Sequence, residues 1–273
     1  MESSASQPQI TDKVLWDQKS GTFSTDLLKI TAMITMLIDH IGAGILEYLI
    51  WATALSPETR SILLDVDKIL RLIGRIAFPL YCYLLVQGFL HTRSRIKYAG
   101  NLLIFALISE YPLDFMSGSS LDFSSLNVIF TLLIGLLTLW GIEKAKSNIF
   151  LIGLISAAGM TLAAILHTDY SWMGILLIVS LYLFRENSLL QCGISFILFF
   201  AASIIRNIGL YNSIRQAVLE QFLSKYTLIL SFWMIYRCNG KRHIKKGKYL
   251  FYIFYPAHLL LLGIILRLIL FLL

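Results

Sequence analysis

Long apolar windows recur along almost the whole chain, and they restrict its fold more than any other feature. About 20 apolar residues are enough for a helix to cross a bilayer. Such windows lie near residues 28–52, 69–90, 97–111, 126–142, 149–166, 171–184, 190–208, 217–236 and 249–272. The chain has 57% hydrophobic and 14% charged residues. A soluble domain could not bury so much apolar surface. The sequence therefore predicts an all-α, polytopic transmembrane helical bundle of about nine spans.

The charged residues between these windows predict an orientation. Most Lys and Arg residues fall in the loops 91–98, 143–148 and 237–248, which share one side if the first span starts in the cytoplasm. The loops on the other side are mixed or acidic, namely 56–68, 112–123 and 167–171. Because positively charged loops stay inside, we expect a cytoplasmic N-terminus, an external C-terminus and a location in the cytoplasmic (plasma or inner) membrane. The same rule explains the net charge of +7 better than nucleic-acid binding does.

The first residues differ from the rest of the chain in being polar. Residues 1–26 contain charged side chains and no apolar stretch typical of a cleaved signal peptide. We expect a polar cytoplasmic tail over 1–26 and a single transmembrane domain over 27–273. Cys82, Cys192 and Cys238 have no metal-site or disulfide spacing, and they are typical of core packing.

Asp39 and His40 lie side by side in the middle of the first window. They follow Leu27 by about twelve residues, roughly 18 Å along a helix, and thus lie near the bilayer midplane. An Asp there costs about 2.5–3.5 kcal/mol, and an ionisable residue inside a membrane indicates a functional site. Since adjacent residues diverge by about 100° around a helix, we expect Asp39 and His40 to meet separate partners from other helices. The alternative is a hydrogen-bonded polar pair that only fixes helix register.

Charged residues in the second and third windows are candidate partners. Arg71 and Arg75 are four residues apart, share a helix face, and suit a carboxylate or a phosphate. Arg71 could instead extend to the lipid interface. Glu110 and Asp114 flank Pro112, where we expect the third helix to break. The two carboxylates are candidate partners for the arginines and His40, and we expect an Arg75–Glu110 ion pair in particular.

Two further polar residues open or interrupt apolar windows. Asn127 starts the fourth window and fits either a helix N-cap or a site residue. His258, in the inner half of the ninth window, is either a second catalytic candidate or a hydrogen-bonded helix contact. The nearby Tyr249, Tyr252 and Tyr255 are more typical of an interfacial aromatic belt than of a binding site.

Five stretches, taken in order, resemble the TraX family of integral membrane proteins. They are LKITAMITMLIDHIG, RLIGRIAFPLYCYLLVQGFLHT, LIFALISEYPLDF, NVIFTLLIGLL and FYIFYPAHLLLL. They cover residues 28 to 142 and 249 to 262, whereas the fifth to eighth windows carry no such signature. The family is named for a conjugation protein that N-acetylates pilin, and it is similar to multi-span acyltransferases. The resemblance implies an acetyl- or acyltransferase that uses acyl-CoA, and it leaves the acceptor open.

The residues and the resemblance together predict how the reaction is arranged. Basic residues of the inner loops could hold the anionic acetyl-CoA or other acyl-CoA, or they could only set topology or meet anionic lipid. These residues are Arg93, Arg95, Lys97, Lys241 and Arg242. His40 would be the general base toward an amine or hydroxyl, with Asp39 or Glu110 stabilising its charged form. The acceptor would be a peptide, protein or glycan bound by Arg71, Arg75, Asp114, Asn127 and His258.

Two other classes of function fit the same residues. In a proton-coupled transporter or flippase, Asp39, His40 and Glu110 would relay protons or bind substrate. The chain shows no inverted repeat of the kind common in transporters, which counts against this alternative. A non-enzymatic assembly scaffold is the third class. No metal is expected in any of them.

Overall fold

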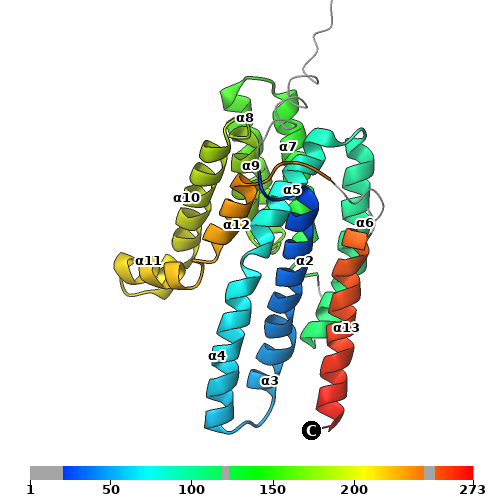
Figure 1. The fold of residues 1–273 in the computed structure, drawn as a ribbon, viewed down its shortest axis with the longest axis vertical. Helices are drawn as coiled ribbons and strands as arrows, with labels where there is room; N and C mark the ends of the chain where they lie inside the picture. Colours follow the sequence, from blue (N-terminus) through cyan, green and yellow to red (C-terminus); the bar gives the residue numbers. More distant parts are fainter. Residues whose placement is uncertain (1–20, 119–122, 243–249, 273) are drawn as a thin grey trace, which may run out of the picture.

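The computed structural model describes residues 21–118, 123–242 and 250–272, and these residues form a bundle of helices (Figure 1). Within the described residues the extended structure is one isolated bridge between Phe23 and Cys238. The all-helical fold class is confirmed. Most of the predicted N-terminal tail, over residues 1–20, lies outside the described part of the chain.

The first two windows form two antiparallel arms. Helix α2 (Thr25–His40) continues through a π-helical segment, η1 (Ile41–Leu46), into α3 (Glu47–Ala52). The chain then returns through α4 (Pro57–Gly74) and α5 (Ala77–His91). The break between α4 and α5 falls just before Pro79, which occupies the first turn of α5, where proline is tolerated. Ser231 donates to the Ile76 carbonyl and Thr227 to that of Leu72, so α12 satisfies carbonyls at this break.

The remaining helices pack around α5 and α7. In order they are α6 (Arg95–Ser117), α7 (Val128–Lys144), α8 (Ile149–Ile165), α9 (Ser171–Leu183), α10 (Ser188–Asn207), η2 (Ile208–Leu210), α11 (Ile214–Leu223), α12 (Leu228–Tyr236) and α13 (Leu250–Leu272). Helix α13 packs along α6 and also touches α2 and η1, whereas α5 contacts α2, α7, α9 and α12. The C-terminal end of α13 lies at the opposite end of the molecule from the α5–α6 and α7–α8 links (Figure 1).

Three sequence expectations about individual elements are wrong. The window 217–236 is not one span, because the chain turns between α11 and α12, and α11 extends sideways at the left edge of the bundle (Figure 1). The loop expected at 56–68 is helical, since Ser56 caps α4 and its side chain accepts from Thr59 N–H. Pro112 does not break the third helix, because α6 runs on to Ser117 and ends at Gly118 in the left-handed conformation.

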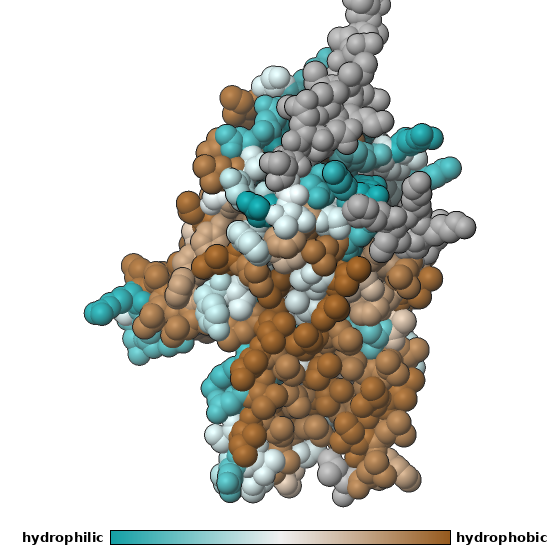
Figure 2. Space-filling model, in the orientation of Figure 1, coloured by the Kyte–Doolittle hydropathy of each residue, from teal (hydrophilic) through white to brown (hydrophobic). Residues whose placement is uncertain are grey.

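Apolar side chains cover much of the outer surface, as expected for a chain surrounded by lipid. Figure 2 shows a broad hydrophobic surface over the middle and lower bundle, with hydrophilic residues at the upper end and along the left edge. Four helical stretches of the described chain are long and apolar enough to cross a membrane: Thr25–Ala52, Pro57–His91, Ser188–Leu210 and Leu250–Leu272. The structure thus supports a membrane protein, and the count of nine spans and the orientation remain predictions.

Candidate functional site

His40 and His258 form the centre of the candidate site. His40 ends α2 where the wider π-helical turns of η1 begin, a local distortion that is frequent at functional sites. His258 lies in the middle of α13, and its Nε2 is 2.7 Å from Nδ1 of His40. The two rings stack at 4.9 Å between centroids. The structure thus joins two histidines that the sequence singled out separately, 218 positions apart.

The hydrogen bonds of this pair determine the positions of its protons. His258 Nδ1 lies 2.6 Å from the Phe254 carbonyl oxygen, which can only accept, so His258 carries its proton on Nδ1. The Nε2 of a neutral His258 is then an acceptor, and His40 Nδ1 donates to it. A neutral His40 therefore keeps its lone pair on Nε2. These two hydrogen bonds leave His40 Nε2 as the basic nitrogen of the pair.

Asp39 points away from His40 and toward α4. Its Oδ2 accepts from Arg71 Nη1 at 2.6 Å. The close approach requires Gly74, because a Cβ at that position would lie 2.0 Å from Asp39 Oδ1. Arg71 Nε also lies 3.6 Å from Glu47 Oε1 at the start of α3. The expectation that Asp39 and His40 find separate partners is confirmed, and Arg71 is bound to carboxylates of the chain itself.

Arg75 is the C-cap of α4, one helical turn after Arg71 and just before the turn into α5. Its guanidinium lies against Tyr170 and near Asp169, both in the link between α8 and α9. The predicted Arg75–Glu110 ion pair is wrong, since no such pair occurs among the described residues. The Arg75 N–H still closes the last turn of α4 by donating to the Arg71 carbonyl at 3.1 Å, but the Arg75 side chain is directed to the α8–α9 link.

Glu110 and Asn127 instead hold α6 and α7 together. Glu110 is fully buried, and its Oε1 accepts from Asn127 N–H at 2.9 Å and Asn127 Nδ2 at 2.7 Å. Asn127 Nδ2 also donates to the Ala106 carbonyl, and Asn127 Oδ1 accepts from Ile129 N–H. Asn127 is thus the N-cap of α7, the first of the two roles expected for it. Asp114 is buried one turn further along α6.

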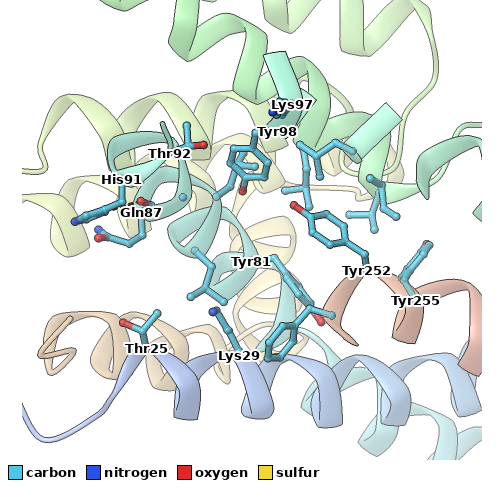
Figure 3. A pocket seen from close by; sticks show the side chains of 18 of the residues that line it. Thr25, Lys29, Tyr81, Gln87, His91, Thr92, Lys97, Tyr98, Tyr252 and Tyr255 are labelled. Carbon is cyan, nitrogen blue, oxygen red and sulfur yellow. Dashed lines mark hydrogen bonds between the residues drawn. The ribbon is translucent and has the colours of Figure 1, made fainter. Parts of the chain in front are cut away.

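A cavity of about 820 Å³ lies one aromatic ring away from the histidine pair, with Tyr255 in its lining. Its walls come from α2, α5, α6, α7 and α13, and Tyr255 lines it at one end. The Tyr255 ring lies edge-on to His258 at 5.7 Å and to His40 at 5.9 Å between centroids. Figure 3 shows Tyr252 and Tyr255 at one end of the cavity and Gln87, His91 and Thr92 at the other. The cavity therefore extends from the α5–α6 link to the immediate neighbourhood of the histidines.

Three of the five basic residues predicted to hold a cofactor line this cavity: Arg93, Lys97 and Arg242. Lys29, on α2, adds a fourth cation that the sequence analysis missed. Arg95 does not line the cavity, because its guanidinium pairs with Glu143 and stacks on Phe89. Lys241 is exposed beside the cavity, where its carbonyl accepts from Thr25 N–H.

The cavity also contains an unsatisfied polar group. Gln87 is 4% exposed, lines the cavity, and its Nε2 has no hydrogen-bond partner within the described residues. A buried amide without a partner costs about 1–3 kcal/mol, which a ligand oxygen could recover. Gln87 and Tyr255 were missed as site residues because each fits the pattern of a residue near the end of a membrane helix. The cavity that they line forms only when α13 packs against α6.

Comparison with known proteins gives one family and one relative. The family model described as "TraX protein" matches residues 24–266. The chain is 28% identical over 249 residues to a protein of Dichelobacter nodosus called "Probable fimbrial assembly protein FimC, serogroup H1", which covers 88% of this chain and 94% of that protein. No solved structure matches the chain.

Proposed function

Because this chain belongs to the TraX family, we propose that it is a membrane-embedded acyltransferase. The donor is acetyl-CoA or another acyl-CoA, and the acceptor is an amine or hydroxyl of a protein subunit. One observation carries the proposal. A cavity lined by cationic residues extends to Tyr255, whose ring lies against a hydrogen-bonded histidine pair.

The lining of the cavity matches the parts of acyl-CoA. Phosphate groups need cations, and four segments of the chain provide them: Arg93, Lys97, Arg242 and Lys29. The Gln87 amide supplies a hydrogen-bond donor below them. Aliphatic residues line the walls between α5, α6 and α7 and suit the apolar parts of the pantetheine arm: Leu84, Leu85, Leu102, Val128, Ile129 and Leu132. The thioester would then lie next to Tyr255, one ring away from His40.

His40 performs the proton transfer in this scheme. Its Nε2 removes a proton from the acceptor as the amine or hydroxyl attacks the thioester carbonyl carbon. His258 fixes the tautomer of His40 through the bond to Nδ1, in the way that a third group orients a catalytic base. Asp39 has no direct contact with His40, so its part is to hold the end of α2 against α4 through Arg71.

The acceptor is proposed from the relative. The Dichelobacter nodosus protein is named for fimbrial assembly. We therefore expect the acyl group to be placed on a subunit of a surface fibre, and the residues around Asp39, Arg71 and Arg75 are candidates for contact with it.

Binding of CoA to the purified protein in nanodiscs tests the donor site. Arg93→Gln and Lys97→Gln should each weaken CoA binding about tenfold or more, because a hydrogen bond to a charged group contributes about 1.5–3 kcal/mol. Arg215→Gln is the matched control, since Arg215 lies exposed on α11 and does not line the cavity. Equal CoA affinity in all three variants would exclude this cavity as the donor site.

A further inference from the structure

Tyr255 occupies the boundary between the cavity and the histidine pair. Its side chain lines the cavity, and the residue is only 6% exposed. Its ring contacts both His40 and His258 edge-on. Any ligand atom that reaches His40 from the cavity must therefore pass beside the Tyr255 side chain.

The Tyr255 hydroxyl has the Val128 N–H as a neighbour, the Glu110 and Asp169 carboxylates nearby, and an available proton. The Val128 N–H, in the first turn of α7, is directed at the Tyr255 oxygen. The first N–H groups of a helix lack intrahelical acceptors and carry a partial positive charge. Within the part of the chain that the structure describes, no acceptor takes the Tyr255 hydroxyl proton. That proton is thus free to be donated to a ligand in the cavity.

We propose that Tyr255 is a catalytic residue that donates a hydrogen bond to the carbonyl oxygen of the donor thioester. The inference rests on the proposed acyltransferase function. As the acceptor attacks, the carbonyl π electrons move to this oxygen, which becomes an oxyanion. A fixed donor aimed at such an oxygen in a buried site is among the strongest contributions to catalysis.

The bonds and protons of the step balance without another reactant. The acceptor nitrogen or oxygen bonds to the carbonyl carbon while His40 Nε2 takes the acceptor proton. Tyr255 stabilises the tetrahedral oxyanion and keeps its own proton. When the carbonyl forms again, the carbon–sulfur bond breaks and the CoA thiolate takes the proton from His40. The products are the acylated acceptor and free CoA.

Acetyl transfer to hydroxylamine, a small acceptor that needs no protein binding site, tests the role of Tyr255. The purified protein in nanodiscs is mixed with acetyl-CoA and hydroxylamine, and the release of CoA thiol is measured above a protein-free background. Tyr255→Phe keeps the ring and removes the hydroxyl, so kcat should fall about 10²–10³-fold with CoA affinity unchanged. Tyr111→Phe, at a 59% exposed position on α6, is the control and should match the unaltered protein.

The outcomes separate this inference from the proposed function. No thiol release by the unaltered protein would overturn both. Normal turnover in Tyr255→Phe, with an active unaltered protein, would overturn the role of Tyr255 alone. If Tyr255→Phe does not fold, 3-fluorotyrosine at position 255 provides the same test. This analogue keeps the ring and the hydroxyl but changes the strength of the hydroxyl as a hydrogen-bond donor, so kcat should change with CoA affinity unchanged, and an unchanged kcat would contradict the proposal.

Discussion

At the scale of single residues, the bond from His258 Nδ1 to the Phe254 carbonyl determines which nitrogen of His40 is basic. The two histidines consequently have different roles, although both lie against Tyr255 at the end of the same cavity. His40 holds the reactive lone pair, and His258 orients it. Asp39 belongs to a separate group with Arg71 on the α4 side.

Histidine substitutions should separate these two roles. His40→Ala removes the base and should lower turnover in the hydroxylamine assay by about 10²-fold or more, with little change in CoA affinity. His258→Gln can still accept from His40 Nδ1 and should have a smaller effect. Gel filtration checks that each variant is folded. Near-normal turnover in folded His40→Ala would refute the assignment, and a greater loss in His258→Gln would move the base to α13.

Double-mutant cycles should locate the partner of Glu110. Glu110→Ala and Asn127→Ala remove two ends of the same hydrogen bonds, so we expect a coupling of about 0.5–3 kcal/mol in the free energy of unfolding. Arg75→Ala and Glu110→Ala share no contact and should add to within about 0.5 kcal/mol. Unfolding in detergent by increasing SDS measures both cycles. Strong coupling between Arg75 and Glu110 would show that the two side chains interact, in contradiction to the structure.

At the scale of elements, the apolar windows predicted most helices well and their breaks poorly. Windows 126–142, 149–166 and 171–184 correspond closely to α7, α8 and α9. The window 217–236 missed the turn between α11 and α12, although Glu220, Gln221 and Lys225 interrupt its apolar residues. Hydropathy also could not reveal that the chain turns at Arg75 and Ile76, and this turn changed the predicted partners of Arg75.

The contact between α2 and α4 depends on Gly74, which has no side chain. Gly74→Ala would place a Cβ 2.3 Å from the Asp39 Cβ, so the helices must separate. Overpacking of this kind costs about 1–3 kcal/mol. Gly193→Ala in α10 meets nothing within 4 Å and should be neutral or stabilise the helix by up to about 1 kcal/mol. Thermal unfolding in detergent compares them, and equal midpoints would show that α2 and α4 tolerate a wider spacing.

At the scale of the whole molecule, the fold brings the basic links to one end. The α5–α6 and α7–α8 links and residues 237–242 lie in the upper part of Figure 1, and the C-terminus lies at the lower end. The sequence predicted the membrane class and the grouping of charge, since both follow from composition. The cavity could not be predicted, because Lys29, Gln87, Lys97 and Tyr255 approach one another only in the packed bundle.

Cysteine labelling should determine the orientation. The three native cysteines are buried and would first be replaced by alanine. A single cysteine at Ser147, in the α7–α8 link, should then react with a membrane-impermeant maleimide only from the cytoplasmic side. One at Glu58, at the start of α4, should react only from outside. Labelling of both positions from the same side would contradict the predicted topology.

We propose above that this chain transfers an acyl group from acyl-CoA to an acceptor, with His40 as the base. The mass of the acceptor after the reaction tests this most directly. The purified protein in nanodiscs would be incubated with isotope-labelled acetyl-CoA and an extract of cells that lack the gene. We predict that mass spectrometry finds a labelled acyl group on a protein subunit. The label should be absent when His40→Ala replaces the unaltered protein, although that variant still binds CoA. An equal amount of labelled product with His40→Ala, or none with folded, CoA-binding unaltered protein, would contradict the account.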